Sequence, residues 1–210
     1  MYKEVEKVIP YREQKIDNAI AYFASEFHAR KGYYPRQTWI YKFLALLDFR
    51  TLKKTGIPCL GLEYDAMKYG PVPSRLYDKR PGLETDKFRF VTTNDKGCRV
   101  EAKKDPDLDF FSDNELDVMD EILIAYTQED ADLDTLINDA HKEILAWNKA
   151  WRLAVKEGRG RMPMEFADEF GNLSKKKEKE LTPEEERFLY YQDISALENE
   201  MLFQEPECAG

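Results

Sequence analysis

One stretch of the sequence limits the possible folds more than any other. Between Pro35 and Gly56, a predicted helix carries large apolar side chains around most of its circumference: Trp39, Ile40, Phe43, Leu44, Leu46, Leu47 and Phe49. A helix of this kind is normally buried at the centre of a domain. Proline before it and glycine after it are typical of a helix start and end. We therefore expect this helix to form the core against which the other elements pack.

The remaining pattern predicts a mainly α fold, a compact multi-helix domain with one small β-hairpin and a C-terminal helical extension. Apolar residues recur at helical spacing over four further stretches, 12–30, 112–126, 132–151 and 182–201. Ser112 and Glu115 form a predicted capping box, and Asp132 or Asp134 begins the following helix. Alternating residues predict hairpin strands over 88–92 and 98–102. A hairpin after a helix cluster is also compatible with a winged-helix-like element.

We expect three segments along the 210 residues: an N-terminal segment over 1–14, a domain over 15–170, and a charged linker, amphipathic helix and tail over 171–210. Two interpretations of the last helix stay open. It packs on its own body, or it docks into a groove on a partner through Phe188, Tyr191 and Leu197.

The net charge of −9 is unevenly distributed along the chain. Residues 105–145 contain 14 acidic side chains and one lysine, whereas residues 65–104 contain 10 basic and 6 acidic ones. The overall sign opposes nonspecific nucleic-acid binding, which requires neutralisation of phosphates. The acidic tract instead favours a protein partner with a basic face.

The sequence predicts a cytoplasmic protein without a membrane span. No apolar run approaches the roughly 18 residues that a span needs, and the N-terminus lacks the apolar core of a secretory signal. Cys59, Cys98 and Cys208 are too few and too widely spaced to indicate a disulfide framework.

We expect no metal, no cofactor and no enzymatic activity. His28 and His141 are the two histidines of the chain, and neither has a further ligand at metal-binding spacing. A hidden hydrolase or nuclease is the third hypothesis, with Asp48 and His141 as its best candidate groups. We favour a structural role for Asp48, as a carboxylate that accepts backbone N–H bonds from the loop near Tyr69 and Gly70.

The segment from Tyr69 to Pro73, Tyr-Gly-Pro-Val-Pro, predicts a rigid turn because proline fixes its own backbone and restricts the residue before it. As structure, this turn is a stiff corner between helices. As a functional element, it presents Tyr69, Val72 and Arg75 to a partner, since binding residues are commonly carried on rigid loops.

A DNA-binding regulator is the second hypothesis. Basic residues gather around the predicted hairpin: Arg75, Lys79, Arg80, Lys87, Arg89 and Arg99. A helix-turn-helix with a basic wing has this appearance, but no helix with base-reading side chains precedes the hairpin.

The chain resembles the Panacea antitoxin domain, the SocA/GepA-like, phage-associated family. The run FLALLDFRTLKKTGIPCLGLEYDAMKYGPVPSRLYD carries the resemblance, and the matching positions are Phe43, Leu47, Asp48, Phe49, Thr55, Gly56, Tyr64, Gly70, Pro71, Val72 and Pro73. His141 and Trp147 match a later helix of the family pattern. Asp139 stands where threonine is usual, and the resemblance covers roughly residues 15–152.

The resemblance implies an antitoxin of a type II toxin–antitoxin system, which neutralises a cognate protein toxin by direct contact. Family members are paired with toxins of unrelated kinds, and one relative is a proteolytic adaptor that delivers its toxin to a Clp protease. For this chain we expect toxin contacts from Tyr69, Gly70, Pro71, Val72, Pro73, Arg75, Phe188 and Tyr191. We expect a structural part for the motif residues Asp48, Phe49, Gly56, Tyr64, His141 and Trp147.

Overall fold

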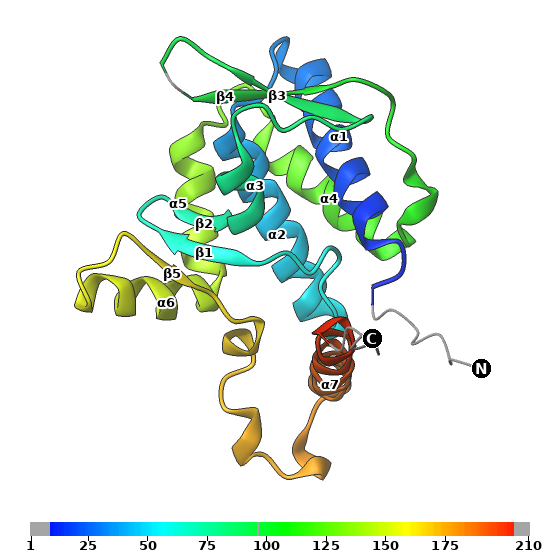
Figure 1. Ribbon diagram of the computed structural model, residues 1–210, viewed down its shortest axis with the longest axis vertical. Helices are drawn as coiled ribbons and strands as arrows, with labels where there is room; N and C mark the ends of the chain where they lie inside the picture. The colour runs from blue at the N-terminus through cyan, green and yellow to red at the C-terminus, as the bar shows by residue number, and fades with distance from the viewer. Residues whose placement is uncertain (1–8, 96, 204–210) are drawn as a thin grey trace, which may run out of the picture.

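The computed structural model of the protein describes residues 9–95 and 97–203 (Figure 1). The tail after residue 203 and most of the expected N-terminal segment lie outside the described residues. The longer helices are α1 (Arg12–Lys31), α2 (Gln37–Thr55), α4 (Asp113–Tyr126), α5 (Leu133–Glu143), α6 (Leu145–Lys156) and α7 (Pro183–Phe203), and α3 (Ser74–Lys79) is short. The strands are β1 (Tyr64–Met67), β2 (Gly70–Pro73), β3 (Phe88–Thr92), β4 (Cys98–Ala102) and β5 (Arg161–Pro163).

Helix α2 is the centre of the fold, as its all-round apolar surface predicts. Every residue from Trp39 to Phe49 is buried, including Lys42 and Asp48. Helices α1, α4, α5 and α7 and strand β2 all pack against it (Figure 1). The mainly α fold with small β elements is therefore confirmed.

The predicted hairpin is confirmed with the expected bounds. Strands β3 and β4 pair antiparallel from Phe88 opposite Ala102 to Thr92 opposite Cys98, and β4 lies against α1 (Figure 1). The capping box of Ser112 and Glu115 is present at the start of α4. Asp132, rather than Asp134, caps α5 by accepting from the N–H of Thr135.

The prediction of a turn over residues 69–73 was wrong. Gly70–Pro73 forms strand β2, the edge of a three-stranded antiparallel sheet in the order β2-β1-β5. Pro71 and Pro73 occupy alternate positions of this edge strand, so neither removes an N–H from the ladder with β1. The sheet was missed because its strands are short and one of them contains two prolines.

The helical stripe expected to run from 132 to 151 is broken at Ile144, where α5 ends and α6 begins. Residues 161–163 then return as β5 to pair with β1. The lysine-rich linker contains two 3₁₀ turns (Leu173–Lys175 and Glu178–Glu180) before Thr182 and Glu185 cap α7. None of the helices in the described part of the chain combines the length and apolarity of a membrane span.

Candidate functional site

The turn between β1 and β2, residues 67–70, is held by buried side chains from two helices. We call this turn the hairpin tip. Lys42 of α2 is completely buried, and its Nζ donates to the carbonyl oxygen of Pro71 at 2.8 Å. Burial lowers the pKa of Lys42 to about 7. From the other side, Nε1 of Trp147 in α6 donates to the carbonyl oxygen of Met67 at 3.0 Å.

His141 of α5 fills the space between these two groups. Its ring stacks on that of Trp147, with centroids 3.7 Å apart and an interplanar angle of 7°. Burial and the nearby charge of Lys42 lower the pKa of His141 to about 4, so the ring is neutral at pH 7. Its Nε2 atom is buried without a hydrogen-bond partner in the described part of the chain.

Gly70 is the residue around which this packing closes. Its φ of +97° is unfavourable for any residue with a side chain. A Cβ atom at this position would lie 2.8 Å from Cε of Lys42 and 3.2 Å from Nε2 of His141. Only glycine allows the strand to approach both side chains so closely.

The outcome of this packing is an exposed aromatic residue on a firmly held turn. Tyr69 is 61% exposed, and Nζ of Lys68 lies 5.3 Å from the centroid of its ring. Trp151, partly exposed, stacks beside Trp147 with centroids 6.2 Å apart. Because a rigid aromatic side chain loses little conformational entropy on binding, this arrangement suits a protein–protein contact.

The structure separates the residues that we expected to contact a toxin. Tyr69 and Arg75 are exposed, whereas Gly70, Pro71, Val72 and Pro73 are buried. The expectation that Val72 is presented on the surface was wrong, because its side chain belongs to the core. Arg75 lies in α3 at the rim of a pocket of about 180 Å³, which also has Leu62, Leu76 and Phe88 in its lining.

Asp48 has the structural role that we favoured, although with a different loop. Its Oδ1 accepts from the N–H groups of Leu60 (2.5 Å) and Gly61 (3.1 Å), and its Oδ2 accepts from the N–H of Leu62 (3.1 Å) and the hydroxyl of Tyr64 (2.9 Å). These donors come from residues 60–64, not from the loop near Tyr69. Burial raises the pKa of the Asp48 carboxyl, and the four hydrogen bonds oppose that rise. The neighbouring Phe49 stacks obliquely on Tyr64, with ring centroids 5.6 Å apart.

The excess negative charge lies on α4 and on the loop that follows it. Three acidic side chains of α4 face solvent at helical spacing, Asp113, Asp117 and Glu121. Glu121 pairs with Lys54 at 3.0 Å. Glu129 and Asp130 extend the exposed negative charge beyond the end of the helix. Glu115, in contrast, is buried in an ion pair with Lys15 at 2.6 Å and adds nothing to the surface field.

Part of the positive charge on and around the basic hairpin is paired with nearby acidic side chains. Glu101 accepts from Arg89 on the neighbouring strand (2.7 Å) and from Arg99 on its own strand (2.6 Å). Arg36 pairs with Asp95 at 2.5 Å, and Lys103 with Glu84 at 2.6 Å. Guanidinium groups held in this way present less free positive charge to a phosphate backbone.

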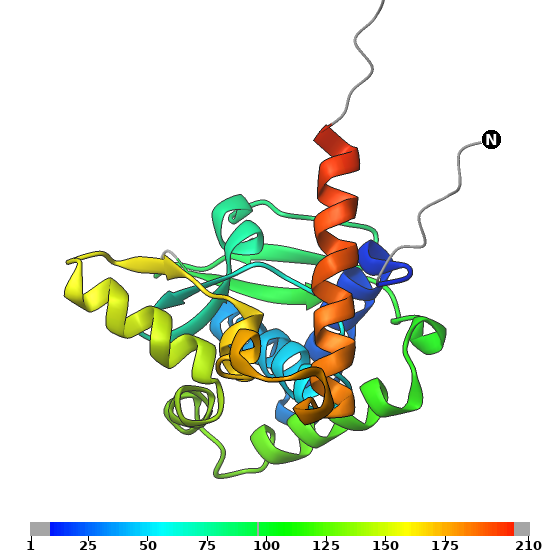
Figure 2. The same cartoon turned by 90° about the horizontal axis from the view of Figure 1, so that it is seen from below.

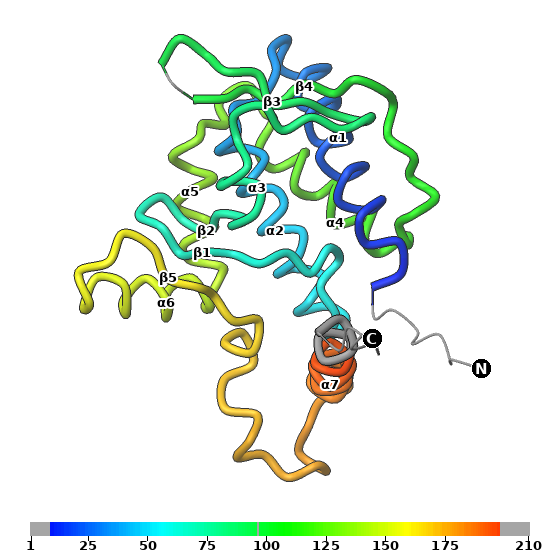
Figure 3. The backbone as a smooth tube through the Cα atoms, viewed as in Figure 1, coloured from blue at the N-terminus to red at the C-terminus, as the bar shows by residue number. Residues whose placement is uncertain are grey.

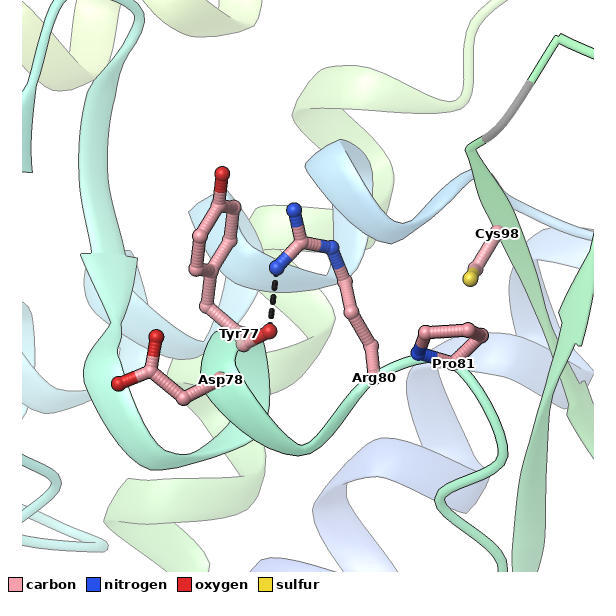
Figure 4. A pocket seen from close by; sticks show the side chains of 5 residues that line it. All are labelled: Tyr77, Asp78, Arg80, Pro81 and Cys98. Atoms are coloured by element: carbon pink, nitrogen blue, oxygen red, sulfur yellow. Dashed lines mark hydrogen bonds between the residues drawn. The ribbon is translucent and has the colours of Figure 1, made fainter.

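A second pocket, of about 230 Å³, opens between α3 and β4 and is lined by Tyr77, Asp78, Arg80, Pro81 and Cys98 (Figure 4). The guanidinium carbon of Arg80 lies 3.2 Å from the centroid of the Tyr77 ring, and Arg80 donates to the carbonyl oxygen of Tyr77 (Figure 4). The guanidinium of Arg80 is therefore engaged by another residue of the pocket wall. In the described part of the chain, no three histidine, cysteine or carboxylate side chains are grouped as a metal centre requires.

Phe188 and Tyr191 lie on the face of α7 that packs against the body. Phe188 is buried, with its ring centroid 4.7 Å from that of Phe170 and 6.2 Å from that of Tyr191. The structure thus corrects the expectation that Phe188 anchors a partner, because the apolar groove that it fills is the protein's own.

Sequence reasoning did not single out Lys42. A lysine within an otherwise apolar helix is the available signal, because a buried lysine needs a specific hydrogen-bond acceptor. The acceptor, the carbonyl of Pro71, belongs to a strand that the sequence did not predict.

The hairpin tip and the residues that hold it, Lys42, His141 and Trp147, fall within a recognised family pattern. Residues 40–148, which include most of α2, the hairpin tip, α4 and α5, match the family described as antitoxin SocA-like, Panacea domain. No curated protein and no solved structure matches the chain. Since the match extends over more than half of the 210 residues, the chain belongs to the SocA-like antitoxin family with the Panacea domain.

Proposed function

We propose that this antitoxin neutralises a protein toxin by direct contact, with the hairpin tip as its principal anchor. The observation that carries the proposal is Tyr69, an exposed aromatic side chain on a turn fixed from behind by Lys42, His141 and Trp147. A small number of buried aromatic anchors supplies most of the binding energy at protein interfaces. A turn that does not need to become ordered on binding saves part of the entropic cost.

The charge distribution supports a toxin with a basic face. The exposed carboxylates of Asp113 and Asp117, with Glu129 and Asp130 beyond them, create a negative field that accelerates encounter with such a protein. Most of this effect is on the association rate, and it weakens as salt screens the charges. In this proposal the protein acts in the cytoplasm and performs no chemistry of its own.

The alternative of a DNA-binding regulator has less support. It depends on the basic hairpin, where Glu101 already engages Arg89 and Arg99. Delivery of the toxin to a Clp protease is a variant of direct contact, because an adaptor must also bind its cargo.

The test uses the product of the neighbouring gene as the candidate toxin. The two proteins are co-expressed, growth is scored, and binding is measured by pull-down and biolayer interferometry. Tyr69→Ala is compared with Tyr33→Ala, whose side chain is similarly exposed (53% against 61%) but lies before α2. We expect Tyr69→Ala to weaken binding about 30-fold, a loss typical of a central anchor, and Tyr33→Ala to leave it unchanged.

Each outcome has a distinct meaning. Rescue together with a stoichiometric complex that depends on Tyr69 supports the proposal, and rescue without a stable complex favours the adaptor variant. A complex that is insensitive to Tyr69→Ala refutes the hairpin tip as the anchor. Absence of both rescue and complex refutes direct neutralisation of this candidate.

A further inference from the structure

Helix α7 has a second group of apolar side chains, beside the face that packs on the body. Tyr190 and Leu197 are 62% and 50% exposed, and Ile194 between them is partly exposed. The spacing i, i+4, i+7 places these three side chains in one stripe. At 100° per residue, the stripe lies about 180° to 240° around the helix from the buried Phe188. We call Tyr190, Ile194 and Leu197 the outer stripe.

The inner face already accounts for the attachment of α7. Phe188 fills the groove beside Phe170, and Glu185 is held by Lys176 at 2.6 Å and by the N–H of Thr182 at 3.1 Å. Tyr190 and Leu197, the exposed members of the outer stripe, are not needed for this attachment. A helix with apolar side chains around much of its circumference is normally covered on more than one side.

The position of the stripe leaves it accessible to another molecule. Viewed from below, α7 stands across the edge of the body and its C-terminal end extends beyond the other elements (Figure 2). The backbone trace shows the same helix set apart from α6 and from the β2-β1-β5 sheet (Figure 3).

The charged side chains beside the stripe indicate what kind of partner surface would fit it. Glu186 and Asp193 are exposed along one border of the stripe, and Arg187 is exposed along the other, by the same helical spacing. A groove that accepts this helix needs an apolar floor with lysine or arginine on the matching rim. A second copy of this chain fits poorly with its stripe antiparallel, because that arrangement brings the carboxylates of the two copies together. Three side chains are also far fewer than the 20–30 residues a side of a standard stable interface.

We propose that the outer stripe docks into an apolar, basic-rimmed groove on the toxin, as a second contact besides the hairpin tip. This inference rests on the proposed function. The toxin is then held at two separated places, by a rigid turn and by the free face of a helix. Two such contacts on one molecule raise the overall affinity above that of either alone.

The test replaces the apolar side chains without weakening the helix. Tyr190→Gln with Leu197→Gln removes the stripe, and Gln192→Ala with Ala196→Gln is the matched control at two exposed positions off it. Circular dichroism verifies that helix content is unchanged. Affinity for the neighbouring gene's product and the mass of the chain alone are measured for each variant.

We expect the stripe variant to weaken binding at least about tenfold, mainly through faster dissociation, and the control to remain within about twofold. Unchanged affinity of the stripe variant overturns the inference, and if Tyr69→Ala still weakens binding, the proposed function stands. A dimer of the unsubstituted chain that the stripe variant converts to monomer, with toxin affinity unchanged, also overturns it in favour of a second copy. If the unsubstituted chain does not bind the candidate toxin, both proposals fall together.

Discussion

Replacing Gly56 by alanine should loosen α7 from the body. The variant tests whether this motif residue of the domain supports the packing of the C-terminal helix. Gly56 ends α2 with a φ of +83° and lies beneath the first turns of α7. A Cβ atom there would overlap the carbonyl oxygen of Glu184 and lie 2.8 Å from Cβ of Arg187. Both obstacles belong to the helical framework of α7, so a side-chain rotation cannot relieve the overlap.

The expected loss of stability has two parts, which a control variant separates. An alanine in the left-handed region costs about 1 kcal/mol. Displacing α7 also costs the burial of Phe188, about 2 kcal/mol for a large apolar side chain. Gly32 ends α1 with a similar φ of +77°, but nothing lies within 4 Å of its Cβ position. We expect Gly32→Ala to cost about 1 kcal/mol and Gly56→Ala about 3 kcal/mol.

Urea unfolding provides the free energies, and limited trypsin digestion reports on α7 itself. The linker before α7 has lysines at 175, 176, 177 and 179, so a loosened helix should accelerate cleavage there in Gly56→Ala alone. Equal destabilisation by the two variants, with equal cleavage rates, would refute the reasoning. It would mean that α7 does not press on Gly56 in solution.

Two further predictions concern the buried polar residues of α2. The pKa of Lys42 is about 7 in the folded chain and 10.5 in the unfolded one, so the unfolded state binds more protons between these values and stability rises with pH. The free energy of unfolding should therefore rise from pH 7 to 10 by up to about 1.4 kcal/mol per pH unit, and Lys42→Met should abolish this rise. Parallel pH curves for the variant and the unsubstituted chain would contradict the prediction. Asp48→Asn should cost about 3 kcal/mol because an amide nitrogen then faces a buried donor, while the exposed Asp117→Asn should cost less than about 0.5 kcal/mol.

The elements that depend on local sequence patterns were predicted from the sequence. Helix α2, the hairpin of β3 and β4, and the caps at Ser112 and Thr182 all follow from apolar periodicity and from side chains within three or four residues of one another. The strand β2 could not be predicted in this way, because its pairing with β1 and its contact with Lys42 depend on tertiary structure. The same limit explains why a buried Phe188 and an exposed Tyr190 could not be distinguished: both are large and aromatic, and only the packed body decides which face of α7 it covers.

The two buried polar residues of α2 support the fold, whereas the residues proposed to bind the toxin are exposed. Asp48 fixes the segment after α2 through three backbone N–H groups, and Lys42 fixes the edge of β2 through one carbonyl. Both are inaccessible, so their loss should reduce stability. Binding should follow the folded fraction for variants of Asp48, whereas loss of Lys42 also loosens the strand behind the hairpin tip. Tyr69 and the outer stripe have the opposite character, because they are exposed and their removal leaves no buried polar group unpaired. Binding measured against the fraction folded therefore separates the two kinds of effect: variants of Asp48 should follow the fraction folded, and variants of Lys42, the hairpin tip and the outer stripe should fall below it.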